Sequence, residues 1–258
     1  MPEEIVPKST SILQDPWQGL QQFTAARIAL GRTGAAVPLQ QALDFKLAHA
    51  FARDAVYSEL DKQLLTDGLQ TISPRHYWLH SQATDRATYL QRPDLGRRLN
   101  DNSIQQLSTE PTDPCNIAIV LVDGLSATAI NEHALPYLQI ILPALQAKQF
   151  TIAPITVVQQ GRVAIGDEIG ALLKAKLTIV LIGERPGLSS PNSMGAYITY
   201  QPALGLSDES RNCISNIRPE GLPLQAAAAT LLYLVSEALR LQLSGVGLKD
   251  DALTYKIQ

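Results

Sequence analysis

Three segments rich in aliphatic residues occur in the second half of the chain, and each ends in a polar turn. Residues 116–122, 151–158 and 177–182 form these runs, which are rich in Ile and Val. Such runs are typical of strands that are buried on both faces of a parallel sheet. Residues 163–174, between the last two runs, carry apolar residues at helical spacing. Strands that alternate with helices predict an α/β fold with a parallel, doubly wound sheet.

The first half of the chain has a helical pattern instead. Apolar residues recur about every four positions over residues 39–65, and a second helix is expected to follow Pro93. Between them, residues 76–80 are compatible with a short strand. Residues 109–114 contain two prolines and predict a linker.

The pattern therefore predicts three parts. A polar segment with three prolines gives a flexible N-terminal arm over residues 1–16. A helical N-terminal region follows over residues 17–110. The α/β domain occupies residues 111–258 and ends in a long helix over residues 223–244.

The composition excludes several classes of protein. Hydrophobic residues make up 45% of the 258 residues, too many for a disordered chain. The net charge of −3 gives no support for binding to nucleic acid or to anionic lipid. The two cysteines, Cys115 and Cys213, exclude a disulfide scaffold, and no Cys/His cluster indicates structural zinc. No signal peptide or membrane-spanning run is evident, so the expected location is the cytoplasm.

The fraction of charged residues, 17%, lies below the usual ~25%. Two explanations stay open: an ordinary well-buried domain, or a surface that contacts another protein. Arginines cluster in residues 27–34 and 92–98. These clusters fit either a solvated helix face or a protein interface, where arginine is enriched.

Candidate ligand sites lie in four polar loops, residues 123–126, 160–163, 184–187 and 212–216. Ligands of open parallel sheets bind past the carboxyl ends of the strands, although strand-to-helix turns collect Gly, Asp, Asn and Ser in any case. The sequence has no GxGxxG, no P-loop and no GxSxG element, and we predict no catalytic residue in this chain. His76 and His80 have a metal-binding spacing only on a helix, which Pro74 disfavours, so no metal site is predicted.

Several segments occur in an order and spacing that resemble one known family. They are residues 27–34, 92–99 (RPDLGRRL), 122–126 (VDGLS), 161–163 (GRV), 183–188 (GERPGL) and 213–217 (CISNI). Single segments are weak indicators, but the ordered set covers residues 17–247. The sequence is similar to the small subunit of ethanolamine ammonia-lyase.

This resemblance implies a Rossmann-like parallel-sheet domain, preceded by a helical N-terminal region, in a hetero-oligomer with a large catalytic subunit. It implies adenosylcobalamin as the cofactor and the conversion of ethanolamine to acetaldehyde and ammonia. It also implies cofactor contacts from Val163, Glu184 and Cys213. The family often carries a longer, helical N-terminal extension that is associated with bacterial microcompartments. Residues 1–16 are short and contain Pro7, so packaging into a microcompartment is an open expectation.

The three contact residues lie in the loops of the predicted crevice, and each has a plain structural alternative. Val163 could be a core residue, Glu184 could pair with Arg185, and Cys213 could be buried packing. Gly183 is expected to let a ligand approach the backbone. Removal of the Glu184 carboxylate is expected to weaken cobalamin binding with little effect on folding.

Two other functions compete with this prediction. One is a freestanding α/β enzyme that binds a nucleotide, and the other is a non-catalytic interaction module. The chain has no Asp-x-His-x-x-Gly element, so it is not expected to supply a histidine to cobalt. The chain alone is expected to lack lyase activity.

Overall fold

The computed structural model describes residues 12–109 and 113–250. The chain divides into two compact units. The first comprises the described part of Met1–Arg53 together with Gly187–Ser190, and the second comprises the remaining residues. Most of the expected arm (residues 1–16) and part of the expected linker (residues 109–114) lie outside the described residues.

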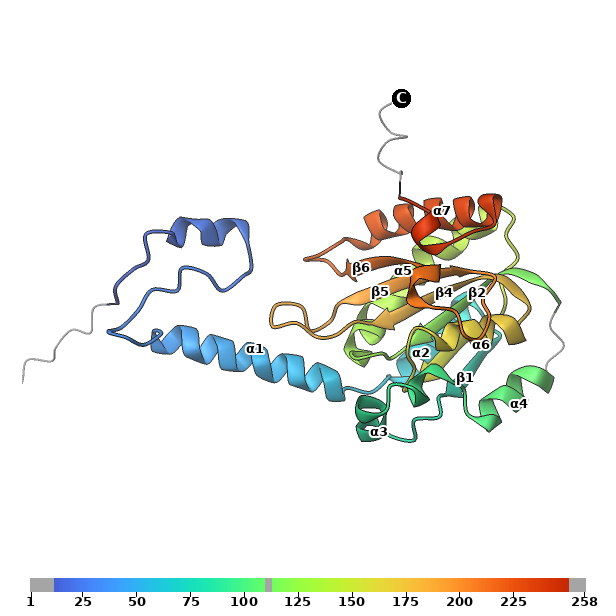
Figure 1. Ribbon diagram of the computed structural model, residues 1–258, viewed down its shortest axis with the longest axis horizontal. Helices are drawn as coiled ribbons and strands as arrows, with labels where there is room; N and C mark the ends of the chain where they lie inside the picture. Colours follow the sequence, from blue (N-terminus) through green and yellow to red (C-terminus); the bar gives the residue numbers. More distant parts are fainter. Residues whose placement is uncertain (1–11, 110–112, 251–258) are drawn as a thin grey trace, which may run out of the picture. The chain divides into compact units, whose positions relative to one another are not determined.

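The second unit is built on a six-stranded sheet with the order β1-β3-β2-β4-β5-β6 (Figure 1). The strands are β1 (His76–His80), β2 (Cys115–Val122), β3 (Ile155–Gln159), β4 (Ala175–Gly183), β5 (Met194–Tyr200) and β6 (Arg211–Ile217). The first four strands in this order pair in parallel. The molecule is thus a mixed α/β protein with a mostly parallel sheet.

The prediction of a wholly parallel sheet is wrong at one edge. β5 pairs antiparallel with β4, and β6 pairs antiparallel with β5. The connections over residues 184–193 and 201–210 contain no α-helix. A parallel pair needs a long crossover, whereas an antiparallel pair needs only a short loop. These two connections therefore impose antiparallel pairing.

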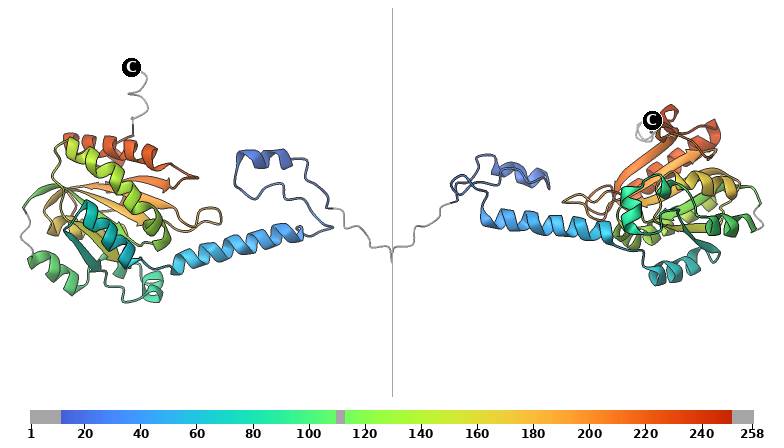
Figure 2. Two further views of the ribbon diagram at one scale, coloured as in Figure 1. Left: turned by 180° about the vertical axis from the view of Figure 1, so that it is seen from behind. Right: turned by 60° about the horizontal axis from the view of Figure 1, so that its bottom comes forward.

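Helices cover both faces of the sheet (Figures 1 and 2). One core is formed by the sheet with α2 (Lys62–Ile72), α5 (Ala127–Ala147) and α7 (Leu224–Leu241). The other core contains side chains of α4 (Asp101–Thr109) and α6 (Ile165–Leu172). The chain moves in opposite directions from β2 to β3 and from β3 to β4, so right-handed crossovers place α5 and α6 on opposite faces.

Strand β2 shows why a run of apolar residues correctly predicted a strand that is buried on both faces. Ile117, Ile119 and Leu121 enter one core, and the residues between them enter the other. Side chains alternate across a strand, so a strand covered on both faces needs apolar residues at every position. The central strands are consequently fixed by burial on both sides.

Helix α7 has the length and composition of a membrane span, and it is the one such helix among the described residues. Leu231 and Val235 on this helix are fully buried in the core of the sheet. This packing is the ordinary arrangement of a core helix in an α/β protein.

The helical region differs from its prediction in two respects. The helix expected over residues 39–65 is divided into α1 (Leu39–Tyr57) and α2, because Asp61 caps α2 by accepting a hydrogen bond from Leu64 N at 3.0 Å. The single helix expected after Pro93 is divided into η2 (Leu95–Arg97) and α4, and an additional short helix, α3 (Arg86–Gln91), precedes Pro93.

Strand β1 forms where residues 76–80 were expected to be extended, and it pairs with β3. Residues 54–109 therefore belong to the same unit as the later strands, and the expected boundary at residue 111 does not coincide with the division between the units. The chain of the first unit contains η1 (Gln18–Phe23) and residues 39–53 of α1.

Candidate ligand-binding site

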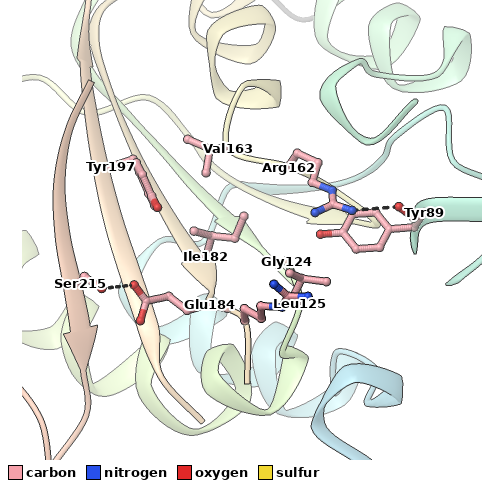
Figure 3. A pocket seen from close by; sticks show the side chains of 11 residues that line it. Tyr89, Gly124, Leu125, Arg162, Val163, Ile182, Glu184, Tyr197 and Ser215 are labelled. Carbon is pink, nitrogen blue, oxygen red and sulfur yellow. Dashed lines mark hydrogen bonds between the residues drawn. The ribbon is translucent and has the colours of Figure 1, made fainter. Parts of the chain in front are cut away.

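A cavity of about 420 Å³ lies at the carboxyl ends of β2, β3 and β4 (Figure 3). It is lined by Tyr89, Gly124, Leu125, Arg162, Val163, Ile182, Gly183, Glu184, Arg185, Tyr197 and Ser215. Three of the four loops predicted from sequence thus meet here. The fourth predicted segment, residues 212–216, lies within β6 and contributes Ser215.

The location follows from the topology. The chain moves in one direction across the sheet from β2 to β3 and in the other direction from β3 to β4. The loops that leave β2 and β3 therefore lead to helices on opposite faces. A crevice forms where neighbouring connections diverge in this way. β6 runs in the same direction as β4, because each is antiparallel to β5, so its carboxyl end reaches the same edge.

Two glycines allow the first turn of the site to close. Leu125 N donates a hydrogen bond to Gly183 O at 2.9 Å, and Gly124 has a φ of 58°. A Cβ on Gly183 would collide with the carbonyl oxygen of Ser126, and one on Gly124 with that of Gly183. The β2–α5 turn of the chain itself thus fills the space that a Gly183 side chain would occupy, and Gly183 also lines the cavity, so the approach of a ligand to its backbone stays a prediction.

Asp123 holds two of the loops together. Its carboxylate, 4% exposed, accepts hydrogen bonds from Gly124 N (2.8 Å), Gln160 N (2.7 Å) and Gly161 N (3.0 Å). Burial raises the pKa of Asp123 to about 6, although these backbone donors and Arg86 act in the opposite direction. Asp123 thus has a structural task between the ends of β2 and β3.

Arg162 and Tyr89 form one wall of the cavity (Figure 3). Arg162 Nη2 donates to Tyr89 O at 3.0 Å, and the guanidinium lies 4.1 Å from the centre of the Tyr89 ring. Sequence reasoning missed Tyr89, because its place depends on contact with a residue 73 positions away. The sequence did indicate the position of Arg162, because this residue lies in the GRV segment beside Val163.

Glu184 is tied to the neighbouring strands. Ser215 Oγ donates to its Oε1 at 2.5 Å (Figure 3), and Asn216 N donates to its Oε2 at 3.0 Å. Ser193 Oγ also donates to Oε2. These three donors, and not the alternative partner Arg185, satisfy the carboxylate among the described residues. Glu184 therefore links the end of β4 to both antiparallel strands.

A β-bulge in β6 directs two of these donors. The register between β5 and β6 shifts near Met194 and Ala196, so that Ser215 and Asn216 are opposed by a single residue. Asn216 has a φ of 60°, in the left-handed region that non-glycine residues rarely adopt. Backbone strain of this kind often accompanies binding sites.

Val163 and Cys213 have different positions. Val163 is half-buried and lines the cavity with Glu184. Cys213 does not line it, but faces Tyr197, a lining residue, across the β5–β6 pair. Cys213 is exposed, so the buried-packing alternative is wrong for this residue.

The thiol of Cys213 is not suited to nucleophilic chemistry. Partial desolvation raises its pKa, and the Glu184 carboxylate adds to this effect, whereas the Tyr197 hydroxyl opposes it. The thiol is therefore protonated at neutral pH, and only a thiolate is a strong nucleophile. Within the part of the chain that the structure describes, no group of three or more His, Cys, Asp or Glu residues could hold a metal.

Fold and site together define an α/β protein with a ligand cavity at the point where its strand order reverses. The family description of the ethanolamine ammonia-lyase light chain matches residues 14–249. The chain belongs to this family of lyase subunits.

Individual relatives agree with this assignment. The chain is 53% identical over 247 residues to the ethanolamine ammonia-lyase small subunit of Pseudomonas putida (strain W619), a match that covers 95% of this chain and 91% of the relative. It is 54% identical over 243 residues to the small subunit of Pseudomonas fluorescens (strain Pf-5), covering 93% and 88%. It is 53% identical over 242 residues to that of Azotobacter vinelandii (strain DJ), covering 93% and 90%.

Proposed function

We propose that this chain is the small subunit of an adenosylcobalamin-dependent ethanolamine ammonia-lyase, which converts ethanolamine to acetaldehyde and ammonia. In this proposal the cavity binds one side of the cobalamin at the interface with the large, catalytic subunit. The observation that carries it is the meeting of Val163 and Glu184 at one cavity in a chain that matches the family over nearly its full length.

The donors and acceptors of the cavity suit a corrinoid. The rim of a corrinoid carries amide groups, and buried amides need both kinds of partner. Glu184 Oε1 has one donor, Ser215, and retains capacity to accept a further hydrogen bond. The hydroxyl of Tyr89 is buried without a partner, although its residue lines the cavity.

The size of the cavity indicates how such a ligand would be shared. A volume of about 420 Å³ holds only part of a cobalamin. The remainder would lie against another surface, in keeping with a cofactor enclosed between two subunits. We infer that this chain binds and orients the cofactor and excludes water from one side of it, while the large subunit binds ethanolamine.

Within this proposal each predicted residue has a task. Val163 contacts the corrinoid beside Arg162, Glu184 accepts hydrogen bonds from its amides, and Cys213 contacts it as a neutral thiol. Bound adenosylcobalamin supplies the radical chemistry of carbon–nitrogen cleavage. We assign no catalytic residue to this chain, because Asp123 is occupied by backbone amides and Cys213 is protonated. A Rossmann-like classification and a cytoplasmic location, inside or outside a microcompartment, stay predictions.

Reconstitution tests the proposal. The chain is combined with a cognate large subunit and adenosylcobalamin, and ammonia release from ethanolamine is measured together with the corrinoid absorbance. We expect activity only when all three components are present. Ammonia release by this chain and cofactor without a large subunit would support the freestanding-enzyme alternative. Assembly without any change in corrinoid absorbance would support the interaction-module alternative.

A further inference from the structure

Three buried polar atoms without hydrogen-bond partners gather at one end of the cavity. They are Arg86 Nη2, Tyr89 Oη and Arg162 Nε. The Arg162 guanidinium lies 4.1 Å from the centre of the Tyr89 ring, and the Arg86 guanidinium lies 4.6 Å from it. Buried polar groups are nearly always paired, so three unpaired atoms around one ring need an explanation.

The cluster opens toward the cavity. Tyr89 and Arg162 are lining residues, and Tyr89 is fully buried at 0% exposure. Figure 3 shows the Tyr89 hydroxyl directed into the space between Arg162 and the Gly124 turn. A ligand in the cavity therefore lies within the reach of Tyr89 and Arg162, and Arg86 supports them from the Tyr89 ring without lining the cavity itself.

Three other nitrogen atoms of the two arginines hold the cluster in place. Arg86 Nε donates to Val56 O at 2.6 Å, and Arg86 Nη1 donates to Gly124 O at 2.8 Å. Arg162 Nη2 donates to Tyr89 O at 3.0 Å. Neutral carbonyl groups accept these bonds, so the positive charges are positioned but not neutralised by them. Such preorganisation lowers the cost of binding a ligand.

The charge balance favours an anion. Two guanidiniums are present, and the carboxylate that acts on Tyr89 and Arg86 is Asp123. That carboxylate already accepts three backbone hydrogen bonds. Arginine nitrogens can only donate, and the Tyr89 hydroxyl, beside the Arg86 guanidinium, has a proton of its own to donate, so Arg162 Nε and this hydroxyl require an acceptor. Charge-assisted bonds from arginine to phosphate oxygens are among the strongest of this kind.

We propose that Arg162, Tyr89 and Arg86 form an anion subsite that binds a phosphate oxygen of the ligand in this cavity. The proposal rests on the proposed function, in which the ligand is a cobalamin. The phosphodiester of the cobalamin nucleotide loop is then the group that occupies the subsite. The rest of the cavity, around Glu184, contacts uncharged amides.

The test compares two corrinoids on the assembled complex of this chain with its large subunit. Cyanocobalamin contains the nucleotide loop with its phosphodiester, and dicyanocobinamide lacks both. Dissociation constants are measured from the corrinoid absorbance for the wild type, Arg162→Gln and Tyr89→Phe. Arg97→Gln is the matched control, because it removes the same charge from an exposed position that does not line this cavity.

We expect Arg162→Gln to weaken cyanocobalamin binding about tenfold to a hundredfold, the range of one lost charge-assisted hydrogen bond. Dicyanocobinamide binding should change less than threefold. Tyr89→Phe keeps the ring against Arg162 and should show the same selectivity with a smaller loss. Arg97→Gln should match the wild type with both ligands.

Three outcomes would overturn the proposal. If Arg162→Gln and Tyr89→Phe lose equal affinity for both corrinoids, these residues contact the corrin ring or support the fold and do not bind a phosphate. Unchanged cyanocobalamin affinity in folded Tyr89→Phe and Arg162→Gln would remove the subsite. The third outcome combines two results: inorganic phosphate raises the melting temperature of the wild-type complex but not of Arg162→Gln, and the two corrinoids show no difference. This outcome would assign the subsite to free phosphate. Failure of the wild-type complex to bind either corrinoid would instead reject the proposed function itself.

Discussion

At the scale of single residues, Glu184 has both a structural role and a proposed ligand-binding role, whereas the sequence predicted ligand binding with a structural role only as an alternative. The carboxylate was expected to serve a ligand from a surface loop, with little influence on folding. In the structure it accepts hydrogen bonds from Ser193, Ser215 and Asn216, and so it joins three strands. Oε1, which can still accept a hydrogen bond from a ligand, is therefore held in position by Ser215.

Replacement of Glu184 by Ala should lower both stability and cofactor affinity. Three donors lose their acceptor, which costs about 1–3 kcal/mol in a half-buried site. Cobalamin affinity of the reconstituted complex should fall roughly tenfold to a hundredfold. Glu184→Gln should lose less of both, because one acceptor oxygen remains. Thermal unfolding and corrinoid titration check the two effects, and an unchanged affinity in a folded Glu184→Ala would leave this residue with a structural task only.

Asp123 gives a prediction about pH. Burial raises its pKa from 3.8 to about 6 in the folded chain. Between these values the folded state binds a proton that the unfolded state has lost, so the contribution of Asp123 to stability falls as pH rises. The contribution is fully present below pH 3.8 and is lost through pH 6, a change of about 3 kcal/mol.

Asp123→Asn isolates this effect, because the amide does not titrate. The difference in unfolding free energy between the wild type and Asp123→Asn should decrease steadily from pH 4 to pH 7. Denaturant titrations at several pH values measure this difference. A constant difference would show that the backbone donors from Gly124, Gln160 and Gly161 keep the carboxylate ionised throughout.

At the scale of elements, the site depends on how closely the end of β4 approaches the turn between β2 and α5. Gly124 and Gly183 leave no room for a Cβ on either side of this contact. Leu125 N donates to Gly183 O, and Ser126 then begins α5 as its N-cap. Two loops of the cavity are consequently placed by one backbone contact.

Gly183→Ala should disrupt this contact. The added methyl group meets the Ser126 carbonyl, which belongs to backbone and cannot turn away as a flexible side chain could. We expect a loss of about 3 kcal/mol or more, at the upper end for overpacked sites. Gly19→Ala is the control, since nothing lies within 4 Å of a Cβ there. Equal melting temperatures for the two variants would contradict this account.

At the scale of the whole molecule, the first unit lacks a core of its own. Pro38 and Ala48 are the buried residues among its described positions. Large apolar side chains of α1 are exposed at near four-residue spacing, with Leu43 at 48%, Leu47 at 55% and Phe51 at 55%. Fixing a backbone costs about 1–2 kcal/mol per residue, and burial of this apolar stripe against another surface would offset part of that cost. Under the proposed function, the large subunit supplies that surface.

Substitution of this stripe should therefore affect assembly more than folding. The double variant Leu47→Gln/Phe51→Gln should bind the large subunit at least tenfold more weakly, because large interfaces rely on a few buried apolar anchors. Its own melting temperature should stay close to that of the wild type, since both side chains are exposed. Val246→Gln is the control, an apolar residue 78% exposed in the other unit. Equal affinity of all three proteins for the large subunit would exclude the stripe from the interface.

The sequence by itself determined the family, the alternation of strands and helices, and the loops that meet at the cavity. These features depend on the local sequence: β2 is apolar from Ile117 to Val122 because both of its faces are covered there. The GRV and GERPG segments follow strands directly, so parallel pairing was enough to predict that Val163 and Glu184 would share one edge of the sheet.

Only the tertiary structure decided which segments pair and which side chains meet. The addition of β1 to the sheet and the antiparallel edge depend on pairing between distant segments, which hydrophobic periodicity does not specify. Glu184 meets donors nine to 32 residues away, and Arg162 meets Tyr89 across 73 residues. Such contacts arise from the packing of whole elements, so a local sequence pattern cannot predict them. The polar contacts of this cavity could therefore be identified only from the tertiary structure.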